Sequence, residues 1–313
     1  MAGNLPLKIK SIHELLQLRG LPDTRHPLIS VLDIAGLKKL ARKDADIVAT
    51  TNFYFIGMSR FTQFCLKMKY GQQEYDFDKG VMNFIAPGQV FNFIGDQEEE
   101  MNRSGWLLLL HPDFLWNHPL ALKIKQYEFF DYAVNESLFL SHEEEQTITG
   151  LFRNIEQEYS THIDKFSQEI IISLIESLLG YSARFYQRQF ITRKITHHGI
   201  VRQLDTLLEK AFSPEMLEEN GVPTVKDISG QLNISPNYLS SLLKTLTGNS
   251  TQQHIQEKII MKAKERLMTT DLSVNEIAFE LGFEYPQSFS KLFKTRTNIS
   301  PLEFRKAGRF IKP

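Results

Sequence analysis

The chain has 313 residues, 42% of them hydrophobic, and a formal net charge of −1. This length and apolar content fit two domains with buried cores, and the single cysteine, Cys65, excludes both a disulfide framework and a cysteine-based zinc site within the chain. No apolar run approaches the ~18 residues of a membrane span and the start has no signal-peptide pattern, so we expect a cytoplasmic protein without membrane contact.

A β-rich segment is predicted from about residue 53 to residue 110. Apolar and polar residues alternate from Phe64 to Tyr70, which is the period of a half-buried strand. Glycines punctuate the segment at intervals typical of a sandwich or small barrel, and the apolar strand 107–110 stops at His111 and Pro112. The segment is rich in phenylalanine, which suits either a pocket for an apolar or aromatic effector or an ordinary core: Phe53, Phe55, Phe61, Phe64, Phe77, Phe84, Phe91 and Phe93.

Catalytic and metal-binding patterns are absent from the sequence. A barrel metal site built from several histidines and a carboxylate lacks ligands, because the only histidine of the β region is His111 at its end. There is no glycine-rich phosphate loop and no G-x-S-x-G nucleophile motif. The sequence therefore predicts no metal, no cofactor and no catalytic residue, and a chain that is not an enzyme.

Two helices are predicted within residues 141–195. Ser141 and Glu144 match a capping box at the start of the first helix. The second helix runs from Ser167 to about Gln189 and has apolar residues at alternating spacings of three and four: Ile171, Leu174, Leu178, Tyr181 and Phe185. This heptad-like pattern predicts a contact between helices, either across a dimer or against the chain's own β domain.

The stretch after these helices is predicted to be irregular. Residues 193–199 are polar and histidine-rich, which indicates a short linker, and residues 213–223 contain two prolines and a glycine, which indicates a loop. These features divide the chain into an N-terminal domain of residues 1–140, a helical connector of residues 141–195 and a C-terminal domain of residues 199–313.

The C-terminal domain contains the same helix–turn–helix pattern twice, at residues 224–248 and 273–298. The apolar positions of the first helix recur 49 residues later: Val225, Ile228, Leu232 and Ile234 become Val274, Ile277, Leu281 and Phe283. After one inserted residue the offset is 50, and the second helix of each pair starts at a proline, Pro236 or Pro286, which suits a first helical position. Gly248 and Asn298 fit left-handed helix ends.

Each second helix has one apolar face and an opposite polar stripe. The stripes consist of small, amide and cationic residues: Asn237, Ser240, Ser241 and Lys244 in the first copy, and Gln287, Ser288, Ser290, Lys291 and Lys294 in the second. Such side chains match the base edges of the DNA major groove and the nearby phosphates. A single stripe would be interpreted as a solvated face, but two matching stripes in matching frames predict DNA binding.

A helix between the two copies, from Gln252 to Met268, would span about 26 Å. It could hold two recognition helices near the ~34 Å repeat of B-DNA, so that both enter successive major grooves. Charge agrees, because residues 222–313 carry a net charge of +5 and the preceding 221 residues a net charge of −6.

The stretch from about Gly199 to Phe310 resembles the DNA-binding domain of the AraC/XylS family of bacterial transcription regulators. The resemblance is carried by Gly282-Phe283, by the run from Ser288 to Lys294, and by the run from Ser300 to Arg305. It implies recognition helices that start near Pro236 and Pro286, with the base readers among these residues: Asn237, Ser240, Ser241, Gln287, Ser288 and Lys291.

The resemblance also implies an α+β protein with an N-terminal cupin-like β-barrel, a helical connector that dimerises, and a C-terminal all-α domain with two helix-turn-helix motifs. It implies a transcription regulator, an activator rather than a repressor, whose partners are double-stranded DNA, RNA polymerase, a small-molecule effector and a second copy of the chain. Two alternatives stay open. One is a cupin-type metabolite-binding enzyme with an accessory DNA-binding tail, and the other a regulator whose N-terminal domain only dimerises or meets a protein.

Overall fold

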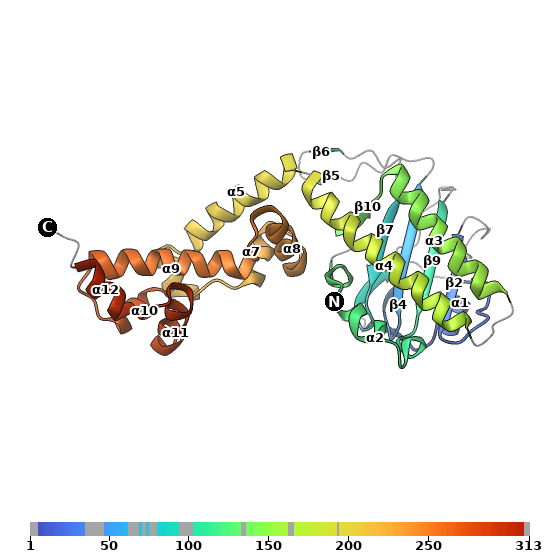
Figure 1. Ribbon diagram of the computed structural model, residues 1–313, viewed down its shortest axis with the longest axis horizontal. Coiled ribbons are helices and arrows are strands. Elements are labelled where there is room, and N and C mark those ends of the chain that lie inside the picture. The colour runs from blue at the N-terminus through green and yellow to red at the C-terminus, as the bar shows by residue number, and fades with distance from the viewer. Residues whose placement is uncertain are drawn as a thin grey trace. The chain divides into compact units, whose positions relative to one another are not determined.

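The computed structural model describes residues 6–34, 47–61, 69–70, 73–74, 80–93, 103–132, 136–161, 166–192 and 194–309. They belong to two compact units, Met1–Gln189 and Phe190–Pro313 (Figure 1). Within the described ranges, no helix is both long enough and apolar enough to cross a membrane.

The strands of the N-terminal unit form two sheets and a short hairpin. They are β1 Leu7–Ile9, β2 Ile29–Asp33, β3 Ile47–Thr51, β4 Tyr54–Phe61, β5 Lys69–Tyr70, β6 Gln73–Glu74, β7 Val81–Ile85, β8 Val90–Phe93, β9 Arg103–Leu110 and β10 Leu138–Phe139. A three-stranded sheet has the order β1-β3-β8, and a five-stranded antiparallel sheet has the order β10-β7-β4-β9-β2. The hairpin joins β5 and β6.

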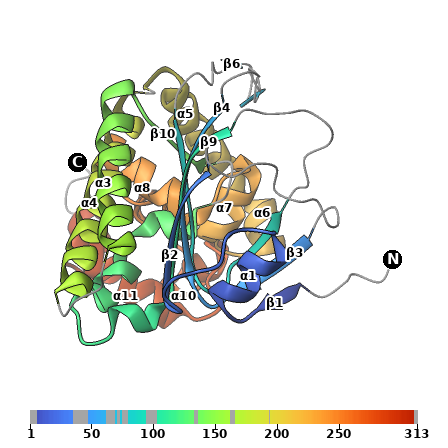
Figure 2. The ribbon, with the colours of Figure 1, turned by 90° about the vertical axis from the view of Figure 1, so that its right-hand side faces the viewer.

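The five-stranded sheet is covered on both faces, which explains the unbroken apolar runs of its central strands. The helices of this unit are α1 Ile12–Leu18, α2 Leu120–Lys123, α3 His142–Ser160 and α4 Ser167–Thr192, with short 3-10 turns at Pro112–Leu115, Ile124–Gln126 and Glu128–Asp131. On one face, Phe55 and Leu109 share a core cluster with α1 and the three-stranded sheet. On the other face, Trp106 stacks on Phe152 of α3. Figure 2 shows α1 on one side of the strands and α3 and α4 on the other.

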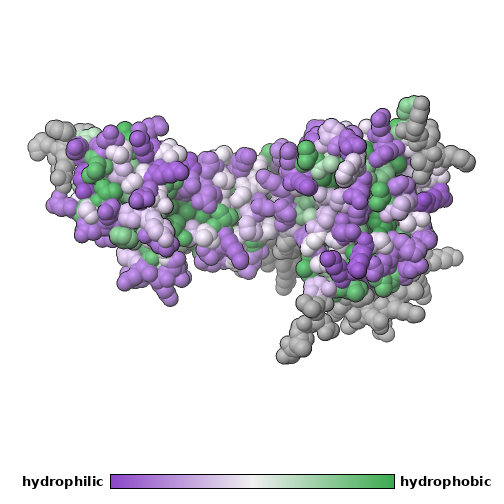
Figure 3. Space-filling view, turned by 90° about the horizontal axis from the view of Figure 1, so that it is seen from below, coloured by the Kyte–Doolittle hydropathy of each residue, from purple (hydrophilic) through white to green (hydrophobic). Residues whose placement is uncertain are grey.

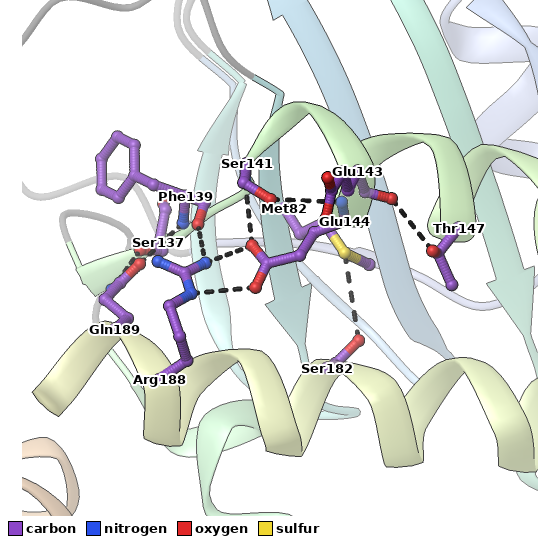
Figure 4. Close-up of polar contacts among 10 residues, drawn as sticks. All are labelled: Met82, Ser137, Phe139, Ser141, Glu143, Glu144, Thr147, Ser182, Arg188 and Gln189. Carbon is purple, nitrogen blue, oxygen red and sulfur yellow. Dashed lines mark hydrogen bonds and ion pairs between the residues drawn. The ribbon is translucent and has the colours of Figure 1, made fainter. Parts of the chain in front are cut away.

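Polar contacts tie the end of α4 to β10 and to the start of α3 (Figure 4). The Arg188 guanidinium donates to the Glu144 carboxylate, with Nε 2.9 Å from Oε1, and to the Phe139 carbonyl at 2.7 Å. The Gln189 carboxamide oxygen accepts from the Phe139 N–H at 2.8 Å. Glu144 also completes the predicted capping box with Ser141, which confirms that motif.

Two expectations for the β region need correction or stay open. The β structure begins before residue 53, because β1, β2 and β3 precede it. The five-stranded sheet has open edges at β10 and β2 among the described residues, so closure into a cupin-like barrel stays a prediction. Most of the strand predicted from Phe64 to Tyr70, including Cys65, lies outside the described residues.

The phenylalanines whose pattern suits either a pocket or an ordinary core are core residues where the structure describes their side chains. Phe53, Phe55 and Phe91 pack in the cluster with α1. Phe84 packs against Phe129, with ring centroids 4.4 Å apart. The remaining four side chains lie outside the described part of the chain: Phe61, Phe64, Phe77 and Phe93.

The C-terminal unit is helical, and its helices largely match the predicted ones. They are α5 Lys194–Ala211, α6 Pro214–Asn220, α7 Val225–Leu232, α8 Pro236–Thr247, α9 Thr251–Thr269, α10 Val274–Glu280, α11 Pro286–Thr297 and α12 Pro301–Arg309. The linker prediction for residues 193–199 is wrong, because α5 begins at Lys194 and runs through Gly199, which a helix tolerates at modest cost.

The loop predicted for residues 213–223 contains helix α6. The Ser213 hydroxyl accepts from the Met216 N–H as an N-cap, Pro214 takes the first position, and Gly221, at φ +68°, ends the helix. These are ordinary start and stop signals. The prolines and the glycine of this stretch predict a loop, whereas in the structure Pro214 and Gly221 mark the two ends of a helix.

Candidate nucleic-acid interface

Helices α7 and α8 form the first helix-turn-helix pair. The hydroxyl of Thr224 accepts from the Asp227 N–H and the Asp227 carboxylate accepts from the Thr224 N–H at 2.8 Å, so α7 starts with a capping box. Asn233 ends α7 in a left-handed conformation, at φ +55°. α8 then opens with Ser235 as N-cap and Pro236 in the first position. Local chemistry therefore fixes both the turn and the start of the recognition helix.

The second pair, α10 and α11, repeats this arrangement in its hydrogen bonds. Ser273 and Glu276 form a capping box 49 residues after the first one. Thr247 at the end of α8 donates to the carbonyls of residues 243 and 249, and Thr297 at the end of α11 donates to those of residues 293 and 299. Asn298 adopts the left-handed end expected of it, at φ +63°. The duplication is thus structural as well as sequential.

Each recognition helix is held by its apolar face. Leu239 and Leu242 of α8 are fully buried, as are Phe289 and Phe293 of α11. The two phenylalanines share a core cluster with residues of α9 and α10, including Leu267. α9 contacts α7 and α8 of the first pair and α10 and α11 of the second. It is therefore the connecting helix that the sequence predicts between the two copies.

The opposite faces of α8 and α11 are solvent exposed. Gln287, Ser288, Lys291 and Lys294 are exposed on α11, and Asn237 and Lys244 are exposed on α8. Ser241 and Ser290 are half-buried. Figure 3 shows mainly hydrophilic side chains on the face of the C-terminal unit seen from below, with apolar residues scattered between them. Both stripes therefore present hydrogen-bonding side chains to solvent.

Ser240 differs from the other predicted base readers. Its hydroxyl donates to the Thr251 hydroxyl at 3.1 Å, and Thr251, the first residue of α9, is completely buried. The Ser240 side chain therefore joins α8 to α9. Periodicity places Ser240 on the polar stripe, but only the tertiary structure shows this partner.

Tyr285 is an exposed residue that the sequence interpretation missed. It is 61% exposed and immediately precedes α11, where it occupies the N-cap position without a side-chain capping bond. Tyr285 lies next to the predicted readers Gln287 and Ser288 at the N-terminal end of α11. Recognition helices contact bases chiefly through their N-terminal residues. The sequence feature that could have pointed to Tyr285 is the extra residue between α10 and α11, where the second repeat is one residue longer than the first.

Ion pairs and hydrogen bonds link α9 to its neighbours. The Arg266 guanidinium of α9 pairs with Glu280 of α10 at 3.2 Å. Arg296 of α11 donates to the side-chain oxygen of Gln256 in α9, with Nε 3.1 Å from Oε1. Lys258 of α9 forms an ion pair with Glu209 of α5. These contacts use charges on the flanks of the helices and leave Lys291 and Lys294 exposed.

The capping carboxylates are electrostatically stabilised as anions. The Thr224 hydroxyl and then its N–H lower the pKa of Asp227, and the Ser273 hydroxyl and then its N–H lower the pKa of Glu276. Hydrogen bonds from Ser300, chiefly its N–H, lower the pKa of Glu303 at the start of α12. Among the residues that the structure describes, no group of three or more His, Cys, Asp or Glu side chains could hold a metal ion.

The connector residues predicted to dimerise divide into two sets. Ile171, Leu178 and Phe185 are buried within the N-terminal unit, whereas Leu174 is half-buried and Tyr181 is 39% exposed. Burial inside that unit accounts for the first set without a second copy of the chain. The predicted dimer contact stays a prediction for Leu174 and Tyr181.

Residues 228–307 match a family described as "Helix-turn-helix domain". The uncharacterized HTH-type transcriptional regulator YfiF of Bacillus subtilis (strain 168) is 29% identical over 143 residues, which is 46% of this chain and 42% of that protein. The HTH-type transcriptional activator RhaS of Klebsiella pneumoniae (strain 342) is 32% identical over 105 residues, which is 34% of this chain and 35% of that protein. The match thus spans less than half the length of these curated relatives.

Among solved structures, the DNA-binding domain of AdpA, a global transcriptional factor in complex with a target DNA, is 26% identical. The match covers 35% of this chain and 96% of that domain, with a TM-score of 0.31. The sequence comparisons agree with the duplicated, capped helix pairs described above. Residues 228–307 are therefore a helix-turn-helix domain of the AraC type, as the sequence resemblance implied.

Proposed function

We propose that this chain is a sequence-specific DNA-binding transcription regulator whose helices α8 and α11 enter successive major grooves of duplex DNA. One observation carries the proposal: polar stripes at equivalent positions of two equivalent helices are exposed on a single helical domain. Two relatives of this chain are named as an HTH-type transcriptional regulator, YfiF, and an HTH-type transcriptional activator, RhaS. The net charge of +5 over residues 222–313 also favours a polyanionic partner.

The exposed residues are assigned two roles. Asn237, Gln287, Ser288 and Lys291 read base edges, because amides, hydroxyls and amines can donate to and accept from major-groove groups. Their place in the first half of each helix supports this role, since recognition helices present their N-terminal residues to the bases. Near the other end of their helices, Lys244 and Lys294 contact phosphates. The half-buried Ser241 and Ser290 lie midway along the helices, and Ser241 stays among the predicted base readers.

The test starts with selection of preferred sites from random duplex DNA by the full-length chain. Gln287→Ala should then cost about 1–3 kcal/mol of binding and relax the base preference at one position of the site. Lys294→Ala should weaken binding to all sequences and lower the slope of log affinity against log salt by about one. Lys210→Ala is the control for charge, since Lys210 is exposed on α5 in the same unit. Equal effects of Lys294→Ala and Lys210→Ala would contradict the assignment.

The N-terminal unit is proposed to regulate the DNA-binding domain by sensing a small-molecule effector, with activation of transcription through RNA polymerase in the cytoplasm. Support for activation comes from the named function of the activator RhaS, to which this chain is similar over 105 residues. A thermal-shift screen of metabolites tests the sensing role. Stabilisation by a metabolite supports it, and stabilisation by none favours a unit that only dimerises or meets a protein.

We further propose that two copies associate through the outward face of α4. The exposed face of that helix carries Ile170, Leu174 and Tyr181, which are left after the buried residues have packed against the sheet. Leu174→Glu should therefore shift the full-length chain from dimer to monomer in analytical ultracentrifugation. Gln187→Glu, an exposed change on the same helix, should leave the mass unchanged.

A further inference from the structure

Two helix-ending glycines of the C-terminal unit meet backbone to backbone. Gly221 ends α6 at φ +68°, and Gly282 lies in the turn after α10 at φ +82°. A Cβ added to Gly282 would lie 2.9 Å from both the carbonyl carbon of Gly221 and the nitrogen of Val222. No side chain separates the two segments, so the turn between α10 and α11 rests on the chain just before α7.

The first repeat shows that the left-handed conformation alone does not require glycine here. Asn233 occupies the position 49 residues before Gly282, adopts φ +55° and is exposed. Asparagine tolerates this conformation when space is available. What distinguishes Gly282 from Asn233 is the close approach of the Gly221 backbone. The glycine is therefore required by a contact between the second helix-turn-helix pair and the segment just before the first.

This contact joins the second pair to the segment that leads into the first pair, at a second place besides α9. The first link is α9, whose Thr251 bonds to Ser240 of α8 and whose C-terminal half packs in the core cluster of α10 and α11. The single helix α9 fixes the separation between the two pairs. It resists rotation of one pair about the α9 axis less well. The glycine contact lies in the loops, supported by the packing of α10 against α6, and opposes such rotation. Phe283, beside Gly282, transmits the position to α11 through its contact with Phe289, with ring centroids 5.5 Å apart.

We propose that Gly282 is a positioning residue that holds α11 at a fixed distance and rotation from α8, so that the protein distinguishes DNA sites by the spacing of their two halves. This inference rests on the proposed DNA-binding function. A methyl group at Gly282 would require the two backbones to separate by about 0.6 Å to reach ordinary van der Waals distance. Since backbone lies on both sides, the separation must be taken up by movement of one helix pair against the other.

The test compares two alanine variants of the full-length chain at glycines of nearly equal φ, +83° for Gly248 and +82° for Gly282. Gly248→Ala has open space around its Cβ, whereas Gly282→Ala meets backbone at 2.9 Å. On the preferred two-part site, Gly282→Ala should bind about tenfold more weakly than the wild type, the size of one lost base contact. Gly248→Ala should bind as the wild type does.

Spacing preference separates positioning from general damage. Adding or removing one base pair between the half-sites shifts them by about 3.4 Å and rotates them by about 35°. The wild type and Gly248→Ala should discriminate sharply against these altered sites. Gly282→Ala should prefer a different spacing or discriminate less. A Gly282→Ala protein with the affinity and spacing profile of the wild type would overturn the proposal.

A measurement without DNA keeps this test independent of the proposed function. Spin labels at Thr245 and Thr295, equivalent exposed positions of α8 and α11, report the distance between the helices in a Cys65→Ser background. The distance distribution should be shifted or broadened by Gly282→Ala and unchanged by Gly248→Ala. If the wild type binds no DNA, the proposed function fails, while the distance distributions still decide whether Gly282 positions α11. If Gly282→Ala does not fold, Phe283→Leu, which removes the ring contact with Phe289 that carries the position of Gly282 to α11, decides both measurements by the same criteria.

Discussion

Replacing Ser240 by alanine separates a structural role of this residue from a base-reading role. Its hydroxyl donates to that of Thr251 at 3.1 Å, and Thr251 is completely buried at the start of α9. Removing one partner of a buried hydrogen bond costs about 1–3 kcal/mol, because the other partner loses its bond without regaining water. Ser240→Ala should therefore lower the free energy of unfolding of the C-terminal unit by about that amount.

The repeat supplies a matched control for this prediction. Ser290 occupies the same register of α11, but the counterpart of Thr251 is Pro301, which is buried and has no hydroxyl. Both serine-to-alanine changes gain the same small helix propensity of about 0.5 kcal/mol, so the difference between the two variants isolates the hydrogen bond. Ser290→Ala should remain within about 0.5 kcal/mol of the wild type.

Urea unfolding of the full-length chain can resolve the C-terminal unit. Both tryptophans of the chain, Trp106 and Trp116, lie in the N-terminal unit, so their fluorescence reports on that unit alone. Far-UV circular dichroism reports on helices of both units, and a transition that it detects without a fluorescence change belongs to the C-terminal unit. Equal midpoints for Ser240→Ala and Ser290→Ala would refute the structural role. A changed base preference in Ser240→Ala at unchanged stability would restore the base-reading role.

Three further predictions concern the core, the helix caps and the connector. Phe293→Ala should cost about 3–5 kcal/mol of unfolding free energy, because Phe293 is fully buried, whereas Phe279→Ala at a 58% exposed site should change it by less than about 0.5 kcal/mol in the same urea titration. Hydrogen bonds from Ser273 lower the pKa of Glu276, so the stabilisation by the Glu276 carboxylate is fully present above the ordinary pKa of 4.5 and is lost as pH falls toward the lowered value. The difference in unfolding free energy between the wild type and Glu276→Gln should therefore narrow on acidification. A difference independent of pH would contradict this cause. Arg188→Met should cost about 2 kcal/mol in tryptophan-monitored unfolding, because its charge-assisted bonds to α3 and β10 are lost, with Arg188→Lys intermediate since lysine cannot bind both carboxylate oxygens together.

The C-terminal helices could be predicted from sequence because their signals are local. Caps, prolines at first positions and apolar periodicity act within a few residues, and the repeat provides each signal twice. Cap and first-position signals are also present for α6, at Ser213, Pro214 and Gly221, but the same residue types favour a loop, so the sequence alone does not separate the two. The exposed stripe followed from periodicity alone, since the buried face of each helix determines the opposite one.

The N-terminal unit was less predictable because its order depends on long-range pairing. β2 pairs with β9, more than seventy residues later in the chain, and β1 lies parallel to β3. No local signal specifies such partners, and a strand covered on both faces loses the alternation that marks a half-buried one. The same reason applies to Ile171, Leu178 and Phe185, whose spacing fits a partner helix and a neighbouring sheet equally well.

The differences between the two repeats are more informative about function than their similarities. Similar caps and apolar cores build the same kind of helix pair twice, so positions where the copies diverge can reflect contacts outside the pair. Asn233 became Gly282 where the second pair meets the backbone before the first, and Thr251 became Pro301 where the first pair alone needs a hydroxyl on α9. Both divergences lie where one copy meets the rest of the unit. A domain that only displayed two independent recognition helices would not need them, and their presence indicates that the relative placement of α8 and α11 is itself under structural control.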